Sequence, residues 1–263
     1  MIQAQGSTSS RSQERRLLLA SAVAVVTLIV VCAMAVSLVI VTRRPAAAPR
    51  PVSQAPAFTP TRGKVVFSEH FHDPASNWGT SILEPSGTTF KITTSGYEIV
   101  ATGFLIHTAT SPYRQALQQV GMSLTAKQSA DTPAEAGFGV TCRRGTGQSE
   151  VRYQLYVGGS SWVVLRRDGP SGPGVEPWVL KEGTSPSTAG PAPITVVGIC
   201  ATLADGVSTR VMMFVDGSKV ADLTDTADAL PGLGWLTGLV VVSSEKAPSR
   251  VTATEFDVRN LDG

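Results

Sequence analysis

The sequence predicts an all-β domain, a two-sheet antiparallel sandwich of jelly-roll type, preceded by one transmembrane helix. Three observations predict this. Apolar and polar residues alternate from Gly63 onward, clusters of Gly, Pro, Asp and Ser separate the alternating runs, and Leu17 to Val41 is a run of 25 residues without a charge. The expected organisation is a short cytoplasmic tail (1–16), a transmembrane helix (17–41), a linker (42–62) and an extracellular domain (63–263).

The uncharged run is long enough to cross a bilayer. At about 1.5 Å per residue it extends beyond the roughly 30 Å hydrocarbon core. Arg15 and Arg16 precede it, and Arg43 and Arg44 follow it. Because both flanks are basic, the positive-inside rule does not decide the direction of insertion. We expect the N-terminus inside and the C-terminal domain outside, on the strength of the cysteines discussed below.

Two other interpretations of this segment stay open. A cleaved signal peptide has an apolar core of about 7–15 residues, shorter than this run, although Ala33-Met34-Ala35 offers a cleavage motif. Lipidation at Cys32 would require a small residue before the cysteine, where the chain has Val31. A retained anchor fits the sequence better than either.

A proline-rich linker follows the anchor. Five prolines lie between Thr42 and Arg62, and proline removes backbone donors and fixes φ, which prevents a helix from continuing. Such a segment is an extended spacer of roughly 3 Å per residue. It would hold the domain off the membrane surface.

The net charge of +2 divides unevenly along the chain. Seven of the 22 basic residues and one of the 20 acidic residues precede Gly63, so the rest carries 15 basic and 19 acidic residues. The positive charge therefore belongs to the flanks of the anchor. A mildly acidic domain without a basic stripe argues against nucleic-acid binding.

The alternation has a period of two, which is typical of half-buried antiparallel strands. An Asp216-Gly217 pair between two such runs predicts a tight β-hairpin. No helical period of useful length follows the anchor. The clearest apolar sets are Val120, Met122, Leu124 and Ala126; Ala136, Phe138, Val140 and Cys142; Val151, Tyr153, Leu155 and Val157; and Val211, Met213 and Val215.

In their order and spacing these runs resemble the concanavalin A-like, or LamG-like, jelly-roll superfamily. They are most similar to versions on the outer face of actinobacterial membrane proteins. No single motif is diagnostic, and because the superfamily includes lectins, glucanases and adhesion modules, the fold alone implies no function. The resemblance covers about Val65 to Asn260 and is carried by VVFSEHFHDPASNW, GYEIVAT, VGMSLTA, GFGVTCRR, YQLYV, SWVVLRR, VVGICA, VMMFVDGSKVADLTD and TEFDVRN.

The resemblance implies a disulfide between Cys142 and Cys200. Closing a loop of nearly sixty residues would stabilise the domain by roughly 2–4 kcal/mol. A disulfide persists in oxidising compartments, which supports the outside location. The alternative is two unpaired buried thiols that act as small apolar residues.

The last strand carries two carboxylates. Glycosidases of this superfamily place two acids on one strand in an E-x-D-x-x-E pattern, and Glu255 and Asp257 match its beginning. Asn260 stands where the last acid would be. We therefore expect both acids to face solvent while Phe256 and Val258 fill the core, and we predict no catalytic residues.

Two further clusters carry residue types that bind metals. His70 and His72 share a strand face, but two imidazoles need a third ligand to hold Zn²⁺, so a solvated strand end is expected. Asp222, Asp225 and Asp228 could hold Ca²⁺, although their spacing fits no known loop pattern. We predict no cofactor, with Ca²⁺ as the alternative.

Aromatic side chains offer the best candidates for ligand contacts, since sugar rings stack on exposed aromatic faces. Trp178 follows a Gly/Pro-rich loop, Tyr156 lies opposite the apolar face of its strand, and Trp162 lies in the next strand. These three are the predicted ligand contacts. Trp78 and Trp235 are expected to close the ends of the sandwich.

The sequence therefore predicts a membrane-anchored extracellular binding or sensing module without enzymatic activity. The expected partners are the membrane and a glycan, a cell-wall polymer or a protein, with no nucleic acid. Two alternatives stay open: a saccharide-acting hydrolase of the concanavalin A-like fold, and a structural envelope subunit.

Overall fold

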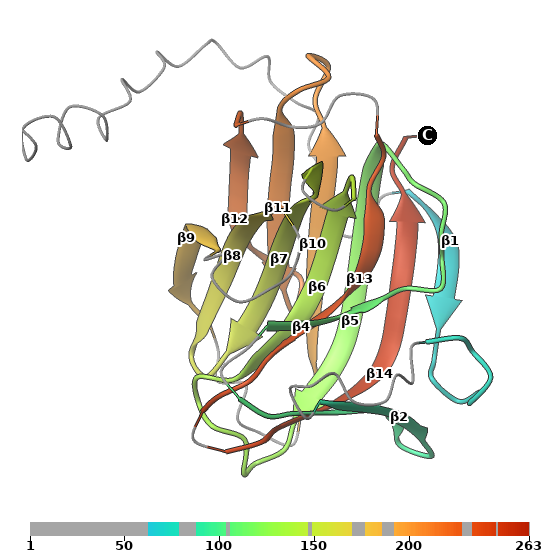
Figure 1. The fold of residues 1–263 in the computed structure, drawn as a ribbon, viewed down its shortest axis with the longest axis vertical. Helices are drawn as coiled ribbons and strands as arrows, with labels where there is room; N and C mark the ends of the chain where they lie inside the picture. Colours follow the sequence, from blue (N-terminus) through green and yellow to red (C-terminus); the bar gives the residue numbers. More distant parts are fainter. Residues whose placement is uncertain are drawn as a thin grey trace, which may run out of the picture. The chain divides into compact units, whose positions relative to one another are not determined.

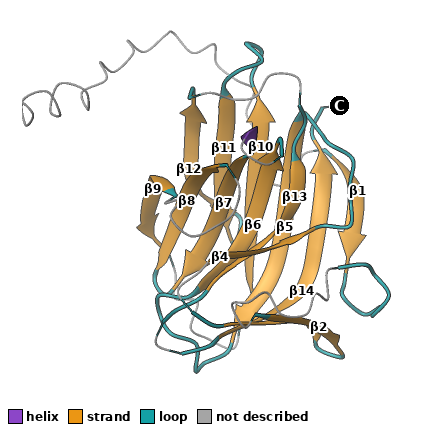
Figure 2. Ribbon diagram, in the orientation of Figure 1, coloured by secondary structure: helices purple, strands orange, loops and turns teal. Residues whose placement is uncertain are grey.

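The computed structural model describes residues 63–78, 88–103, 106–146, 149–169, 177–185, 192–227, 233–245 and 247–262. The predicted tail, anchor and linker lie outside these residues. Within them, no helix is long and apolar enough to cross a membrane. The described chain is built of strands, as the alternation predicted (Figure 1, Figure 2).

Fourteen strands follow one another along the described residues. Their bounds are β1 Lys64–Glu69, β2 Thr89–Thr93, β3 Gly96–Ala101, β4 Ile106–Thr110, β5 Gln119–Gln128, β6 Gly137–Arg144, β7 Val151–Gly158, β8 Ser161–Asp168, β9 Trp178–Thr184, β10 Ile194–Thr202, β11 Thr209–Val215, β12 Ser218–Asp225, β13 Leu236–Val242 and β14 Ser249–Asn260.

The strands form two antiparallel sheets packed face to face. The eight-stranded sheet has the order β12-β11-β10-β5-β14-β3-β2, and β1 also pairs with β14. The six-stranded sheet has the order β4-β13-β6-β7-β8-β9. In Figure 1, β6, β7 and β8 lie in front of β10, β11 and β12. The predicted all-β sandwich is confirmed.

The core lies between the sheets and is made by the alternation. The predicted apolar sets are buried throughout, and Phe256 and Val258 on the last strand are buried as expected. Glu255 and Asp257 lie on the opposite face but are half-buried rather than fully in solvent, and Asp257 Oδ1 is buried. Each strand therefore has one face in the core and one turned outward.

Aromatic rings fill part of the core, as expected for Trp78 and Trp235. Trp78 packs edge-on against Phe256, with ring centroids 5.0 Å apart, and Phe71 stacks on Tyr97 at 5.2 Å. Trp235 is also completely buried. Because these rings are enclosed, they serve packing.

The predicted hairpin joins β11 and β12. Asp216 and Gly217 have φ of 47° and 79°, and two successive positive φ values are those of a type I′ turn, whose twist suits neighbouring strands. The Asp216 carboxylate accepts a hydrogen bond from the backbone N–H of Thr195 at 2.9 Å, which ties the turn to β10.

Candidate functional site

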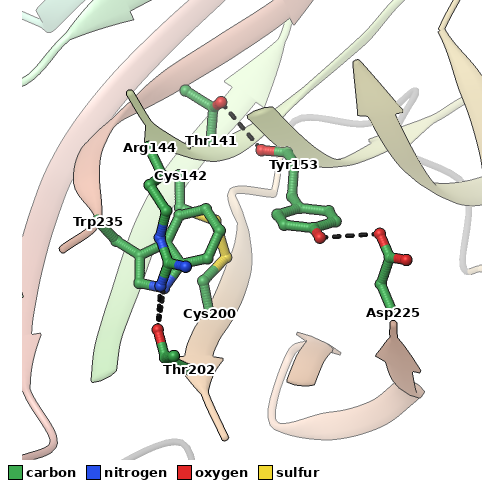
Figure 3. Close-up of a disulfide and its surroundings, with 8 residues drawn as sticks. All are labelled: Thr141, Cys142, Arg144, Tyr153, Cys200, Thr202, Asp225 and Trp235. Atoms are coloured by element: carbon green, nitrogen blue, oxygen red, sulfur yellow. Dashed lines mark hydrogen bonds between the residues drawn. A yellow bond between two sulfur atoms is a disulfide. The ribbon is translucent and has the colours of Figure 1, made fainter. Parts of the chain in front are cut away.

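The disulfide implied by the resemblance is present and joins the two sheets. Cys142 on β6 and Cys200 on β10 are bonded, with a Cα–Cα distance of 6.6 Å (Figure 3). Beside it, the Arg144 guanidinium lies 4.2 Å from the centre of the Trp235 ring and donates to Thr202. This cluster is enclosed and structural.

A second buried network also crosses between the sheets. Arg166 on β8 donates to Asp225 on β12 at 2.7 Å and to Asp168 at 2.8 Å, and the Tyr153 hydroxyl donates to Asp225 at 2.8 Å. Burial and the neighbouring Asp225 charge raise the pKa of Tyr153 far above its usual value. Tyr153 is therefore neutral at physiological pH and acts here as a donor.

The aspartates weighed as an alternative calcium site do not come together among the described residues. Asp222 accepts hydrogen bonds from Arg210 and Lys219 at 2.9 and 3.0 Å, whereas Asp225 is bonded in the core network. The two lie on opposite faces of β12 because their positions differ by an odd number. Asp228 lies outside the described residues, and the described chain holds no group of three potential metal ligands.

The outward face of the six-stranded sheet carries a group of polar side chains at its centre. Tyr153, Leu155 and Val157 point inward, so Gln154 and Tyr156 point outward. We call this surface the outer face. Its members at the centre of the sheet are Thr141 and Arg143 on β6, Arg152, Gln154 and Tyr156 on β7, and Leu165 and Arg167 on β8.

The register arranges these side chains in rows across the strands. One row is made of Arg143, Arg152 and Arg167, which lie opposite one another on β6, β7 and β8. The next row contains Thr141, Gln154 and Leu165, and the third has Tyr156 between Gly139 and Val163.

The sheet curves toward this face. Arg152 on β7 donates to the Thr108 hydroxyl on β4 at 3.1 Å, although β6 and β13 lie between their strands. In a flat sheet three strand spacings alone would separate them by about 14 Å, farther than an arginine side chain reaches. The outer face is therefore concave, and its central side chains are brought toward one another.

Gln154 stands out at the centre of the outer face. Its side chain is 0% exposed, and neither its amide oxygen nor its amide nitrogen has a hydrogen-bond partner. A buried amide without partners costs free energy, and such groups often mark an absent water or ligand. The amide can donate two hydrogen bonds and accept two.

Tyr156 lies beside Gln154 on the same strand and is half-buried. A Cβ placed on Gly137 would come 3.0 Å from the Tyr156 ring, so the glycine allows one flank of the ring to pack closely against the β6 backbone. Burial, and secondarily the charge of Glu182, raises the pKa of the Tyr156 hydroxyl. The hydroxyl therefore stays protonated at neutral pH.

The arginine row has a carboxylate, Glu150, beside it. Glu150 accepts hydrogen bonds from Arg143 at 3.4 Å and from Arg152. Burial lowers the pKa of Arg167, and the nearby positive charge of Arg152 lowers it further. Glu150 therefore bonds to two of the three arginines, and its charge partly offsets the lowering of the Arg167 pKa.

The predicted aromatic contacts do not form one site. Tyr156 lies on the outer face, but Trp162 points into the core and is only 6% exposed, so its ring is not available to a ligand. Trp178 on the edge strand β9 is 56% exposed and lies opposite Arg166, whose guanidinium is 5.6 Å from its ring centre. Trp178 is therefore aligned with the core side of the sheet, away from Tyr156.

Sequence reasoning missed the arginine row and Gln154. The alternation of VRYQLY did place Arg152, Gln154 and Tyr156 on one face, and this was the available signal. That Arg143 and Arg167 stand beside Arg152 depends on strand register.

The two histidines that the sequence placed together do lie near each other. His70 and His72 lie at the end of β1, and their ring centroids are 6.4 Å apart.

Comparison with solved structures identifies the fold. A point mutant of the Emp46p carbohydrate recognition domain is similar at a TM-score of 0.50 and 8% identity, over 74% of this chain and 98% of that one. The fold is that of the concanavalin A-like jelly rolls. No protein-family model matches the sequence, and no curated protein matches it.

Two further concanavalin A-like structures are similar at lower scores. A glycoside hydrolase family 16 endo-glucanase from Bacteroides ovatus has a TM-score of 0.49 and 9% identity, over 73% of this chain and 99% of that one. The carbohydrate binding module CBM66 from Bacillus subtilis has a TM-score of 0.44 and 12% identity, over 66% and 93%. At these identities the likeness concerns the fold alone.

Proposed function

We propose that this protein is a non-catalytic saccharide-binding module and that it binds through the outer face of the six-stranded sheet. The observation that carries the proposal is the Gln154 amide, which is buried on a concave face with both polar atoms unpartnered. Sugar hydroxyls both donate and accept hydrogen bonds, so they would satisfy the amide oxygen and nitrogen together.

The neighbours of Gln154 support a saccharide as the ligand. Ligand sites combine an aromatic or apolar lining with a few placed polar groups. Tyr156 supplies a half-buried ring, and the arginine row supplies polar groups. The Thr141 hydroxyl donates its proton to the Tyr153 carbonyl at 3.0 Å, so it can only accept from a ligand. The Emp46p domain of the same fold is a carbohydrate recognition domain, so saccharides are the first ligand class to test.

The positions of the acids favour binding over hydrolysis. Glycosidases use two carboxyl groups about 5–5.5 Å apart when retaining and about 6.5–9.5 Å apart when inverting. On the outer face, Glu150 precedes β7 and is bonded to arginines, whereas Glu182 belongs to the row of Tyr156. Glu150 lies six residues before Tyr156 along the chain, which is about 20 Å for an extended strand.

We place this module outside the cell, attached to the membrane by Leu17–Val41. A run of 25 uncharged residues is long enough to span a bilayer. The Cys142–Cys200 disulfide is of the kind that persists in oxidising compartments. The Pro-rich linker would then hold the sandwich at a distance from the bilayer, where it can reach envelope glycans.

A glycan array tests the proposal directly. The full-length protein in mild detergent would be compared with Gln154→Ala, Tyr156→Ala and a Trp178→Ala control, whose aromatic ring is exposed but lies away from the outer face. We expect saturable binding that both outer-face variants weaken at least tenfold and the control preserves. Binding lost only in Trp178→Ala would place the binding site at the edge strand β9 instead of the outer face. If the folded protein bound no glycan, the proposed function would be refuted.

The same protein preparations distinguish non-catalytic binding from the alternative function, saccharide hydrolysis. Each bound glycan would be incubated with protein and its reducing ends counted over time. A non-catalytic module leaves the count unchanged. Release of reducing ends that depends on Glu150 or Glu182 would instead make the outer face an active site.

A further inference from the structure

A second apolar cluster lies on the outward side of the eight-stranded sheet. Cys200 on β10 and Met213 on β11 point into the core, so the residues next to them on each strand point away from it. These outward residues are apolar as well, and they pack together with the side chain that follows β14. We call the group the second cluster; its members are Val197, Ile199, Met212, Phe214 and Leu261.

The outward side chains of the second cluster are shielded from water. Ile199 and Met212 are each 1% exposed, and Phe214 is 4% exposed. Neighbours within one sheet contact only the flanks of such side chains, so their tips are buried only if another part of the chain lies over them. The fourteen described strands all belong to the two sheets, so the cover is not a further described strand.

The described chain begins at the edge of the second cluster. A Cβ placed on Gly63 would come 2.6 Å from Cδ2 of Leu261. The Gly63 carbonyl accepts a hydrogen bond from Arg259 Nη1 at 3.4 Å, and Arg259 points outward because its neighbour Val258 is in the core. The chain therefore enters the sandwich beside the second cluster and on the same side of the sheet.

A buried carboxylate oxygen also lies on this side. Asp257 on β14 lies opposite Ser123 on β5, and Ser123 lies opposite Val197 of the second cluster. The Oδ1 atom of Asp257 is buried without a hydrogen-bond partner. Because buried carboxylate oxygens accept hydrogen bonds, the cover should present a donor as well as apolar groups.

From these observations we infer that the end of the chain's own linker, residues 56–62, docks across this side of the sheet and that Phe58 packs on the second cluster. Phe58 is the one aromatic residue between Thr42 and Arg62, and threonine hydroxyls follow it at Thr59 and Thr61. The segment therefore carries both an apolar ring and donors. Prolines at 56 and 60 favour an extended backbone that needs no strand partner, so the segment loses little conformational freedom on docking.

The length of the segment fits the distance to be covered. Phe58 precedes Gly63 by five residues, which is about 16 Å in an extended proline-rich chain. Gly63 lies beside Leu261, and the methyl carbons of Leu261 are 3.7 Å from a Cβ placed on Gly121 of β5. The strands β10 and β11 come next in the sheet, within about 10 Å of β5.

Docking of this segment would give the linker a second role. It would attach the linker to the sheet opposite the outer face, which leaves the outer face open to its ligand, and the spacer proposed above would then comprise residues 42–55. The contact is independent of the ligand class, so either proposal can fail without the other.

Photocrosslinking in full-length protein, held in mild detergent, locates the segment. A photoreactive phenylalanine analogue, p-benzoylphenylalanine, would replace Phe58, and mass spectrometry would identify the peptides joined after irradiation. We expect crosslinks within one chain to β10 and β11, around Met212 and Phe214. The same analogue in place of Val52, which lies in the linker but outside the segment, is the control and should not crosslink to these strands.

Melting curves test whether the contact stabilises the fold. Phe58→Ser should lower the Tm by at least about 3 °C, because the cluster loses an apolar cover. Val52→Ser, the matched control in the same linker, should leave the Tm unchanged. In a Phe214→Ala background the effect of Phe58→Ser should shrink, because residues in contact are not additive.

The outcomes either support the docked segment or overturn it. Crosslinks from position 58 to β10 and β11 of the same chain, with a lower Tm in Phe58→Ser, support it. Crosslinks that join two chains on a denaturing gel would assign the cover to a second copy and overturn it. Crosslinks to other surfaces of the domain, or a Tm that Phe58→Ser leaves unchanged, would overturn it as well.

Discussion

Replacing Gln154 by methionine should stabilise the protein and weaken its ligand binding at the same time. Methionine keeps the length and approximate volume of glutamine but removes both polar atoms. Gln154 is fully buried, and both of its amide atoms lack partners. An unsatisfied buried polar group costs about 1–3 kcal/mol, so Gln154→Met should raise the free energy of unfolding by about that amount when no ligand is present.

Gln128→Met is the matched control. Gln128 is buried on β5 of the other sheet, and it makes a polar contact that the substitution would remove. Only its amide nitrogen is buried without a partner, against both atoms of Gln154. We therefore expect Gln128→Met to be neutral or destabilising.

Urea unfolding followed by tryptophan fluorescence measures both variants in the full-length protein. The slope of free energy against denaturant should be unchanged, so that a shift in the midpoint reports stability. Saccharide binding by Gln154→Met should fall at least tenfold. A loss of 1 kcal/mol or more in Gln154→Met would mean that the amide is satisfied in the folded protein, and the argument for a ligand at this position would fail.

Three other predictions concern the contacts that hold the sandwich together. Replacing Cys142 and Cys200 by alanine opens a crosslink of 58 residues, so the unfolding free energy should fall by about 2–4 kcal/mol; in non-reducing denaturation, a loss below about 1 kcal/mol would contradict the entropic account. Asp225→Asn removes a carboxylate from the buried Arg166 guanidinium, so the free energy of unfolding should fall by about 3 kcal/mol in the same denaturation assay. An unchanged midpoint would show that Asp168 alone is enough to balance the Arg166 charge. Hydrogen bonds from its arginine partner on β11 lower the pKa of Asp222. The stability difference between wild type and Asp222→Asn should therefore be present above the ordinary carboxyl pKa and be lost as pH falls through the lowered pKa of the folded state. Urea unfolding at a series of pH values measures it, and a difference that does not change with pH would refute this.

The local pattern of residues was sufficient to predict the strands and the core. A period of two places successive side chains on opposite faces regardless of which strands pair, so Tyr153 and Leu155 could be placed inside and Tyr156 outside. The Asp216-Gly217 turn was also predictable, because positive φ at both positions is a property of the turn itself. The Cys142–Cys200 pairing followed from resemblance and is confirmed.

Contacts between distant segments required the tertiary structure. Trp162 and Trp178 were expected at the ligand, but the sheet turns one into the core and aligns the other with the core side at the edge. Aromatic identity alone could not distinguish these positions, because an aromatic ring suits a core and a ligand site equally well.

By itself the sequence determined that this chain has an all-β domain with one apolar face on each strand, since that property is set by neighbours along the chain. Only the tertiary structure decided that Arg143, Arg152 and Arg167 form one row and that the sheet bends until Arg152 reaches Thr108. Register and curvature arise from pairing between strands far apart in sequence, and a one-residue slip would have turned each of these side chains to the other face.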